Sequence, residues 1–249
     1  MKRLLPIVIV VALTARGGFA QQPRVPVLVE LYTSEGCSSC PPADVLLESL
    51  QRDQPIAGAD IIPIGLHVDY FNHLGWKDAF SSSSFTARQR SYSPVFGDEN
   101  MYTPQMVIDG ETAIPGVEAD EIQHAIAEAA GKPHLPLRLL ARFAGAKARL
   151  SIDRPAAPSN AEKIQVMAAI TEDGLSSAVT RGENHGRTLH HVAVARALHS
   201  LNFLSAVPST EERLFPIGKE WGQNLKAVVW LQGVKSREVY GAASALIVK

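Results

Sequence analysis

The residue types best suited to chemistry are two cysteines, Cys37 and Cys40, the only cysteines in the 249-residue sequence. They lie between an apolar, β-branched segment and a helix-like segment that opens with two prolines. The two-residue spacing lets both sulfur atoms meet in one turn. Backbone N–H groups and the positive end of the dipole at a helix N-terminus favour a thiolate. The pattern therefore predicts a redox dithiol, in which Cys37 is the exposed nucleophile and Cys40 resolves the mixed disulfide.

Other chemistries for this cysteine pair follow from its setting. A structural disulfide is one alternative, because close cysteines outside the cytosol tend to oxidise. A copper site built from Cys37, Cys40 and His67 is another, because thiolates suit Cu(I). Zinc normally takes four ligands, and covalent haem needs a histidine where Pro41 stands. We expect no cofactor beyond the redox-active disulfide, with copper as the alternative.

A threonine–proline pair is the second candidate feature. Thr103 and Pro104 precede a short apolar run that is typical of a strand. A proline at this junction favours a cis peptide bond, with an ordinary trans proline at a strand start as the alternative. In a fold with this order of elements, the turn lies beside the cysteines. There it limits metal access to Cys37 and presents the Thr103 backbone to a bound peptide strand.

Hydrophobic periodicity divides the chain near residue 133. The first part alternates, with strands expected at 25–32, 61–68, 105–108 and 112–114 and helices at 41–50, 86–92 and 121–130. Ser84 and Asp120 are the expected helix caps. The later part shows strand-like runs at 137–143, 148–152, 164–170, 189–198, 227–231 and 245–248. We therefore expect an α/β domain over 25–131, a linker at 132–134, and an all-β, sandwich-like domain over 135–249.

Residues 1–20 have the pattern of a secretory signal peptide. Lys2 and Arg3 precede an apolar run at 4–13, which is too short to span a bilayer, and small residues allow cleavage after Ala20. An uncleaved anchor is the alternative. We expect a periplasmic or secreted protein with no membrane association after cleavage. The net charge of -1 gives no sign of the basic surface that binds nucleic acid. The expected partners are protein thiols or disulfides and a redox partner.

Residues 25–131 resemble the thioredoxin fold in their order of elements. Stretches at 30–44, 67–70, 75–78 and 102–110, with the motif CSSCPPAD, are also similar to a secreted family of Gram-negative bacteria defined as a domain of unknown function. The similarity extends to 181–187. It implies an α/β thioredoxin-like N-terminal domain, and the strand-like runs after residue 135 add the all-β, sandwich-like C-terminal domain.

The sequence departs from ordinary thioredoxins at three places. Gly36 stands where they carry a tryptophan, Leu31 stands where they carry a buried acid, and Ser38-Ser39 separates the cysteines where they carry Gly-Pro. Glu30, the neighbour of Leu31, is expected on the other face of the strand. Glu35 is expected to be a solvated turn residue, with a role as proton acceptor for Cys40 as the alternative. These changes leave the direction of electron flow open.

Several histidines form weaker candidates. Asp69 is expected either to orient His67 or to belong with it to a capped strand end. His190 and its neighbour His191 are expected on opposite faces of a strand. Either of them could join His185 in a metal site, but a solvated surface turn at 181–187 is the favoured interpretation. Trp76 and Phe80 are expected in the core rather than at a substrate lip.

The sequence thus predicts a periplasmic or secreted thiol–disulfide oxidoreductase acting on protein disulfides. Cys37 and Cys40 carry the chemistry, and Thr103 and Pro104 position the partner strand. The alternatives are a copper-binding module that uses the two thiolates and His67, and a non-catalytic interaction protein with a structural disulfide.

Overall fold

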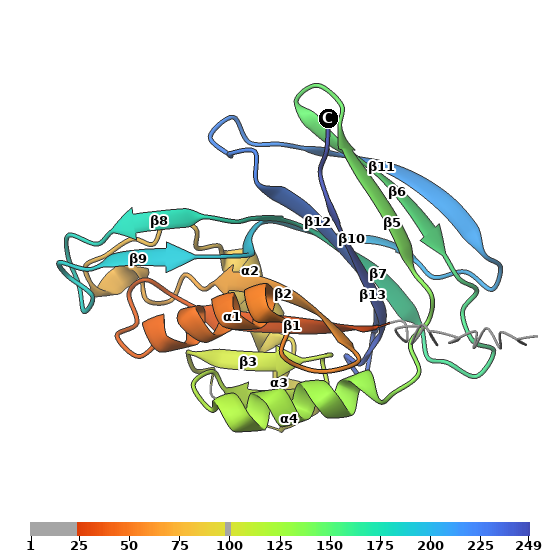
Figure 1. The fold of residues 1–249 in the computed structure, drawn as a ribbon, viewed down its shortest axis with the longest axis horizontal. Coiled ribbons are helices and arrows are strands. Elements are labelled where there is room, and N and C mark those ends of the chain that lie inside the picture. The colour runs from red at the N-terminus through yellow and green to blue at the C-terminus, as the bar shows by residue number, and fades with distance from the viewer. Residues whose placement is uncertain (1–23, 98–100) are drawn as a thin grey trace, which may run out of the picture.

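The computed structural model describes residues 24–97 and 101–249, so the expected signal peptide lies outside the described residues. Three sheets and several helices make up the fold (Figure 1). The strands are β1 (Val25–Thr33), β2 (Ala59–His67), β3 (Gln105–Ile108), β4 (Thr112–Pro115), β5 (Arg138–Phe143), β6 (Lys147–Arg154), β7 (Ile164–Glu172), β8 (Leu175–Ala178), β9 (Thr188–His191), β10 (Val194–Phe203), β11 (Ser209–Pro216), β12 (Leu225–Gly233) and β13 (Val239–Leu246). The helices are α1 (Pro41–Asp53), α2 (Ser83–Arg90), α3 (Ser93–Phe96), α4 (Ala119–Ala130) and the 3₁₀ turn η1 (Asn72–Leu74).

One large sheet contains strands from both parts of the chain. Its order is β13-β12-β7-β10-β2-β1-β3-β4, with β1 parallel to β2 and antiparallel to β3. The junction is a short parallel contact between β10 and β2, where Val194 pairs with Gly65 and the Gly65 N–H donates to the Ala193 carbonyl at 2.8 Å. A Cβ at Gly65 would lie 3.3 Å from the Val192 carbonyl oxygen, so this close approach of two backbones favours glycine.

Both faces of the large sheet are covered. Val29 and Leu31 of β1 point to one face, where they share an apolar core with α1 and α4. Leu28 and Tyr32 point to the other face, toward α2 and the fully buried Trp230 of β12. Because β1 is central and buried on both faces, it forms a nearly continuous apolar run in the sequence.

A separate antiparallel sheet, β11-β6-β5, lies over the β7–β12 part of the large sheet (Figure 1). Leu150 and Ile152 of β6 share a third apolar core with Val166 of β7 and Val229 of β12. The fold therefore combines a mixed α/β sheet that contains parallel strands with a separate antiparallel sheet. In the part of the chain that is described, no helix is long and apolar enough to cross a membrane.

A buried ion pair links β1, α2 and β12. Glu30 is fully buried and accepts hydrogen bonds from Arg88 at 2.5 and 2.8 Å, and Arg88 also donates to Gln232 at 3.0 Å. Tyr92 donates to Glu30 at 2.5 Å, and burial raises the pKa of Tyr92 well above its ordinary range. The expectation that Glu30 faces away from the neighbouring Leu31 is confirmed, since Leu31 lies in the core with α1 and α4 whereas Glu30 bonds Arg88 of α2.

Several expected elements were wrong in extent. The expected strand at 189–198 is two strands, because the chain turns at Ala193, where φ is 49°. The last strand is β13, earlier than the expected 245–248, while the largely polar β8 and β11 gave no apolar signal.

Two expected helix caps were also wrong. The hydroxyl of Ser82, and not of Ser84, accepts from the Ser84 N–H and caps α2. Helix α4 begins at Ala119 after Glu118, so Asp120 lies within its first turn. Asp120 still suits that turn, since a carboxylate near a helix N-terminus interacts favourably with the dipole.

Candidate functional site

The cysteine pair stands at the junction between β1 and α1. Cys37 and Cys40 form a disulfide with their Cα atoms 5.4 Å apart. Cys40 is the N-cap of α1, and Pro41 and Pro42 occupy the first helical turn, where no backbone N–H is needed. The Cys40 carbonyl accepts from the N–H of Ala43 at 2.9 Å and so starts the helix. The predicted placement of the CxxC motif at a helix start is confirmed.

The threonine–proline turn lies beside this disulfide. The Thr103–Pro104 peptide bond is cis, in agreement with the sequence-based expectation. The Thr103 carbonyl oxygen lies 3.9 Å from the Cys37 sulfur. The Pro104 carbonyl accepts from the Gly116 N–H at 2.9 Å, and a Cβ at Gly116 would lie 2.9 Å from Pro104 and 3.1 Å from Ala43. No room is therefore left for a side chain at Gly116, where the β4–α4 connection packs against the Thr103–Pro104 turn and the start of α1.

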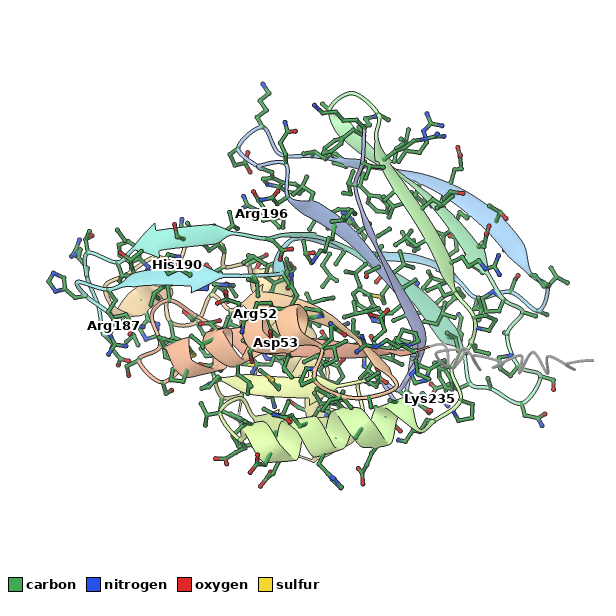
Figure 2. The ribbon with its side chains drawn as sticks, viewed as in Figure 1. Arg52, Asp53, Arg187, His190, Arg196 and Lys235 are labelled. Atoms are coloured by element: carbon green, nitrogen blue, oxygen red, sulfur yellow. A yellow bond between two sulfur atoms is a disulfide. The ribbon has the colours of Figure 1, made fainter. Side chains whose placement is uncertain are left out.

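The segment 181–187 also packs against the cysteine pair, although it lies far away in the sequence. The Asn184 side-chain amide donates to the carbonyl oxygens of Glu35 and Cys37, both at 2.9 Å. The Glu183 carboxylate accepts from the Ser38 N–H at 3.0 Å, and these contacts with Ser38 lower the pKa of Glu183. The β8–β9 hairpin that carries this segment lies beside α1 in Figure 1, and Figure 2 labels Arg187 and His190 on it.

This packing buries the disulfide. Cys37 is 2% exposed and Cys40 is 0% exposed. The expectation of an exposed Cys37 was therefore wrong for the disulfide form, because a segment from the later part of the chain covers the site. Ser38 and Ser39, which separate the cysteines, stay exposed.

Glu35 is a buried hydrogen-bond acceptor and not the solvated turn residue that we expected. Its carboxylate is 0% exposed, and it accepts from the Trp76 indole N–H at 2.8 Å. The other carboxylate oxygen lies 3.2 Å from Nε2 of His191. Although burial opposes protonation, the carboxylates of Asp44 and Glu35 raise the pKa of His191 to about 9. Trp76 is half-buried and joins this polar cluster, in addition to any packing role.

His67 lies in the same buried region but has a different partner from the expected one. Its Nδ1 is 2.7 Å from the Asp78 carboxylate, and its ring packs against Phe80 and His191 with centroid separations of 5.5 and 4.7 Å. Asp69 instead accepts from the Thr86 hydroxyl at 2.5 Å. Burial alone would raise the pKa of Asp78, but His67 and two backbone N–H groups lower it.

Within residues 24–97 and 101–249, no group of three or more His, Cys, Asp or Glu side chains is placed to hold a metal ion. This includes both sets considered from the sequence, Cys37 and Cys40 with His67, and His185 with His190 or His191. His185 and His190 are exposed, whereas His191 is buried. The expectation that the two adjacent histidines face opposite ways is confirmed.

Sequence reasoning did not place Asn184, His191, Asp44 or Asp78 in this site, although it named His191 as a possible metal ligand. All four are at least nine-tenths buried. The family resemblance over 30–44, 75–78 and 181–187 covers Asp44, Asp78 and Asn184, so it was the signal that could have indicated these three. His191 lies outside these stretches, and its contacts with Glu35 and His67 are made by packing between distant elements.

The fold and site have the arrangement on which the resemblance to thioredoxins rested: strand, CxxC at a helix start, strand, helix, Thr–Pro turn, hairpin and helix. The family described as "Protein of unknown function (DUF1223)" matches residues 28–232, and the chain belongs to that family. The expectation that the chain belongs to a family defined as a domain of unknown function is thereby confirmed. No curated protein matches the chain in sequence.

Two solved structures are similar over most of the chain. Protein AGR_C_4864 from Agrobacterium tumefaciens superposes with a TM-score of 0.69 at 25% identity, covering 90% of this chain and 96% of that one. HBP35 of Porphyromonas gingivalis superposes with a TM-score of 0.63 at 11% identity, covering 90% of this chain and 76% of that one. At 11% identity, the similarity to HBP35 concerns the fold alone.

Proposed function

We propose that this protein is a thiol–disulfide oxidoreductase that acts on the cysteines of other proteins. The observation that carries the proposal is the Cys37–Cys40 disulfide at the start of α1, beside the Thr103–Pro104 turn. A helix start favours a thiolate at the first cysteine, because backbone N–H groups and the helix dipole act on it. A close second cysteine can then resolve a mixed disulfide.

In the oxidising direction, a thiolate of a client protein attacks the Cys37 sulfur. The Cys37–Cys40 bond breaks, and Cys40 leaves with the electron pair. A second client thiolate then attacks the client sulfur of the mixed disulfide, which releases Cys37 as a thiolate. The client gains one disulfide and the protein becomes a dithiol, which a further redox partner reoxidises. The reverse sequence reduces a client disulfide, and the Thr103 backbone positions the client strand in both directions.

We extend the proposal to the rest of the chain. Residues 135–249 form a sandwich-like domain that recruits or shields the client, supported by the apolar core that the β11-β6-β5 sheet shares with β7 and β12. The protein works in the periplasm or outside the cell, supported by the signal-like pattern of residues 1–20.

One observation favours a second candidate function, a non-catalytic interaction protein with a structural disulfide. Cys37 is 2% exposed, and Asn184 and Glu183 hold the loop that carries it. A structural disulfide needs no access for other thiols, whereas a disulfide that exchanges with a client does. The two functions differ in whether a client thiol reaches Cys37 in the folded protein.

A trapping experiment separates these candidates. Cys40→Ser leaves Cys37 without its resolving partner, so mixing this variant with an oxidised two-cysteine peptide should give a stable mixed disulfide visible by mass spectrometry. Cys37→Ser is the matched control and should trap far less peptide. An oxidoreductase requires this difference between the variants. Equal, negligible trapping by both variants would support the structural disulfide and exclude the proposed activity.

A further inference from the structure

A cavity lies between α1 and the β8–β9 hairpin. Its volume is about 440 Å³, and its wall includes Pro41, the residue after Cys40. Asp44 of α1 and His191 of β9 form part of its wall, so the two parts of the chain both contribute. Val45, which also lines it, is 64% exposed, so the cavity reaches solvent.

His191 has one ring nitrogen that the fold does not satisfy. The side chain is 2% exposed, and its Nε2 lies 3.2 Å from Glu35 Oε1. Its Nδ1 is buried, makes no hydrogen bond, and lies 3.9 Å from Asp44 Oδ1. A buried imidazole nitrogen without a partner is unfavourable, and such a group calls for an explanation, of which a catalytic role is one.

Asp44 lies close to both this histidine and the cysteine. Residues four apart on a helix are neighbours, so Asp44 lies one turn from Cys40, and the Asp44 N–H donates to the Cys40 carbonyl at 3.2 Å. The carboxylate accepts from the Thr33 hydroxyl at 3.3 Å, and its side chain is 10% exposed. Asp44 therefore stands between the buried end of α1 and a cavity that reaches solvent.

Titratable groups from three other parts of the chain face His191. Glu35 faces it from the loop before Cys37, and Asp44 faces it from α1. The His67 ring of β2 lies 4.7 Å away and is paired with Asp78. The two facing carboxylates raise the pKa of His191 to about 9 despite burial, so the imidazole carries a proton near neutral pH.

Disulfide exchange creates a need for such a proton. When a thiolate bonds to the Cys37 sulfur, Cys40 leaves as a thiolate at a position that is 0% exposed. A buried thiolate lacks hydration, so its formation is disfavoured unless a proton reaches it. Leu31 occupies the place where thioredoxins carry a buried acid, so that acid is missing from β1.

We propose that Asp44 and His191 form the proton route that serves Cys40, with Asp44 next to the cysteine and His191 holding the proton against Glu35. The use of this route in exchange with a client rests on the proposed function, whereas the route itself does not. When the disulfide opens, Cys40 takes a proton from this pair, and the pair recovers one from water through the cavity. When the disulfide forms again, the thiol proton returns along the same path.

The test measures how fast dithiothreitol reduces the disulfide between about pH 6 and about pH 10. The variants are Asp44→Asn and His191→Gln, both of similar size to the native residue. Each should slow reduction near pH 7 by on the order of a hundredfold, the lower end of what a positioned proton donor contributes. The ratio of variant to wild-type rate should approach one above about pH 9, where His191 of the wild type has itself lost its proton.

Matched controls are Asp53→Asn at the far end of α1, which Figure 2 labels, and His124→Gln on α4, and both side chains are exposed. They should keep the wild-type rate at every pH. A defect that is uniform across pH, or a wild-type profile in both test variants, would overturn the proton route. If His191→Gln does not fold, Asp44→Asn decides alone, because Asn keeps an acceptor for Thr33. Dithiothreitol reduces the disulfide whether or not the protein is an enzyme, so failure of the proposed function leaves this test unaffected and appears instead in the peptide-trapping experiment.

Discussion

Asn184 and Cys37 lie 147 residues apart, and the Asn184 side-chain amide donates a hydrogen bond of 2.9 Å to the Cys37 carbonyl oxygen. The same amide group donates to the Glu35 carbonyl, so one side chain fixes both ends of the turn that enters the CxxC motif. The later part of the chain thereby controls the shape and burial of a disulfide that belongs to the earlier part.

Removing this contact should expose the site. We expect Asn184→Ala to lower the free energy of unfolding by about 1–3 kcal/mol, because the Glu35 carbonyl loses its donor and the Cys37 carbonyl keeps only the Cys40 N–H. It should also speed the reduction of the disulfide by a bulky thiol such as glutathione. The control is Asn202→Ala, an exposed asparagine with a single long hydrogen bond of 3.4 Å. Unchanged reduction rates in Asn184→Ala would show that segment 181–187 does not limit access.

The Glu30–Arg88 pair should dominate the link between β1 and α2. Arg88→Met leaves the Glu30 carboxylate buried without its cation, so we expect a loss of about 3–5 kcal/mol in the free energy of unfolding. Arg149→Met removes an exposed pair with Glu212 and should change stability by only about 0–1 kcal/mol. Urea unfolding measures both. Equal effects of the two substitutions would contradict the buried role of Arg88.

Much of the earlier part of the chain could be predicted because its signals are local. The CxxC motif, the two prolines that open α1 and the Thr–Pro pair before β3 each specify their own conformation through neighbouring backbone. The hairpin at Asp109–Gly110 is similar, since the turn requires positive φ at both residues, and they have it at 44° and 72°.

The environment of the site could not be predicted, because it depends on packing between distant segments. Whether Glu35 is solvated depends on β9, which brings His191 against it. Whether His67 pairs with Asp69 or Asp78 depends on the path of the chain around η1. Hydrophobic periodicity and residue spacing describe one helix or strand at a time. The contacts of Glu35 with His191 and of His67 with Asp78 therefore leave no pattern in the sequence.

The raised pKa of His191 should make stability depend on pH. Its ordinary value of 6.5 is raised to about 9 in the folded protein, so folding favours the protonated form. The resulting stabilisation is complete below about pH 6.5 and is lost as pH rises through about 9, by on the order of 2–3 kcal/mol. Urea unfolding of the oxidised protein at several pH values measures it. His191→Gln should flatten this part of the profile, and an equally steep profile in the variant would assign the dependence to another group.

Gly116 should be intolerant of a side chain. A Cβ there would lie 2.9 Å from Pro104 and 3.1 Å from Ala43, between the Thr–Pro turn and α1. We expect Gly116→Ala to destabilise the protein by about 1–3 kcal/mol, as over-packing does elsewhere. Peptide trapping by the Cys40→Ser variant should also fall when Gly116→Ala is added, because the turn moves relative to Cys37. A double variant that is as stable and as reactive as Cys40→Ser would show that the structure tolerates a side chain at position 116.

The central claim is that the Cys37–Cys40 couple exchanges with other proteins, and its reduction potential tests this most directly. Purified protein is equilibrated with glutathione buffers of known potential, and the two cysteines are then alkylated and counted by mass spectrometry. The account predicts a potential between about -270 and about -120 mV, the range of catalytic dithiols. A potential below about -300 mV, with no alkylation of Cys37 in the folded protein, would contradict it and identify a structural disulfide.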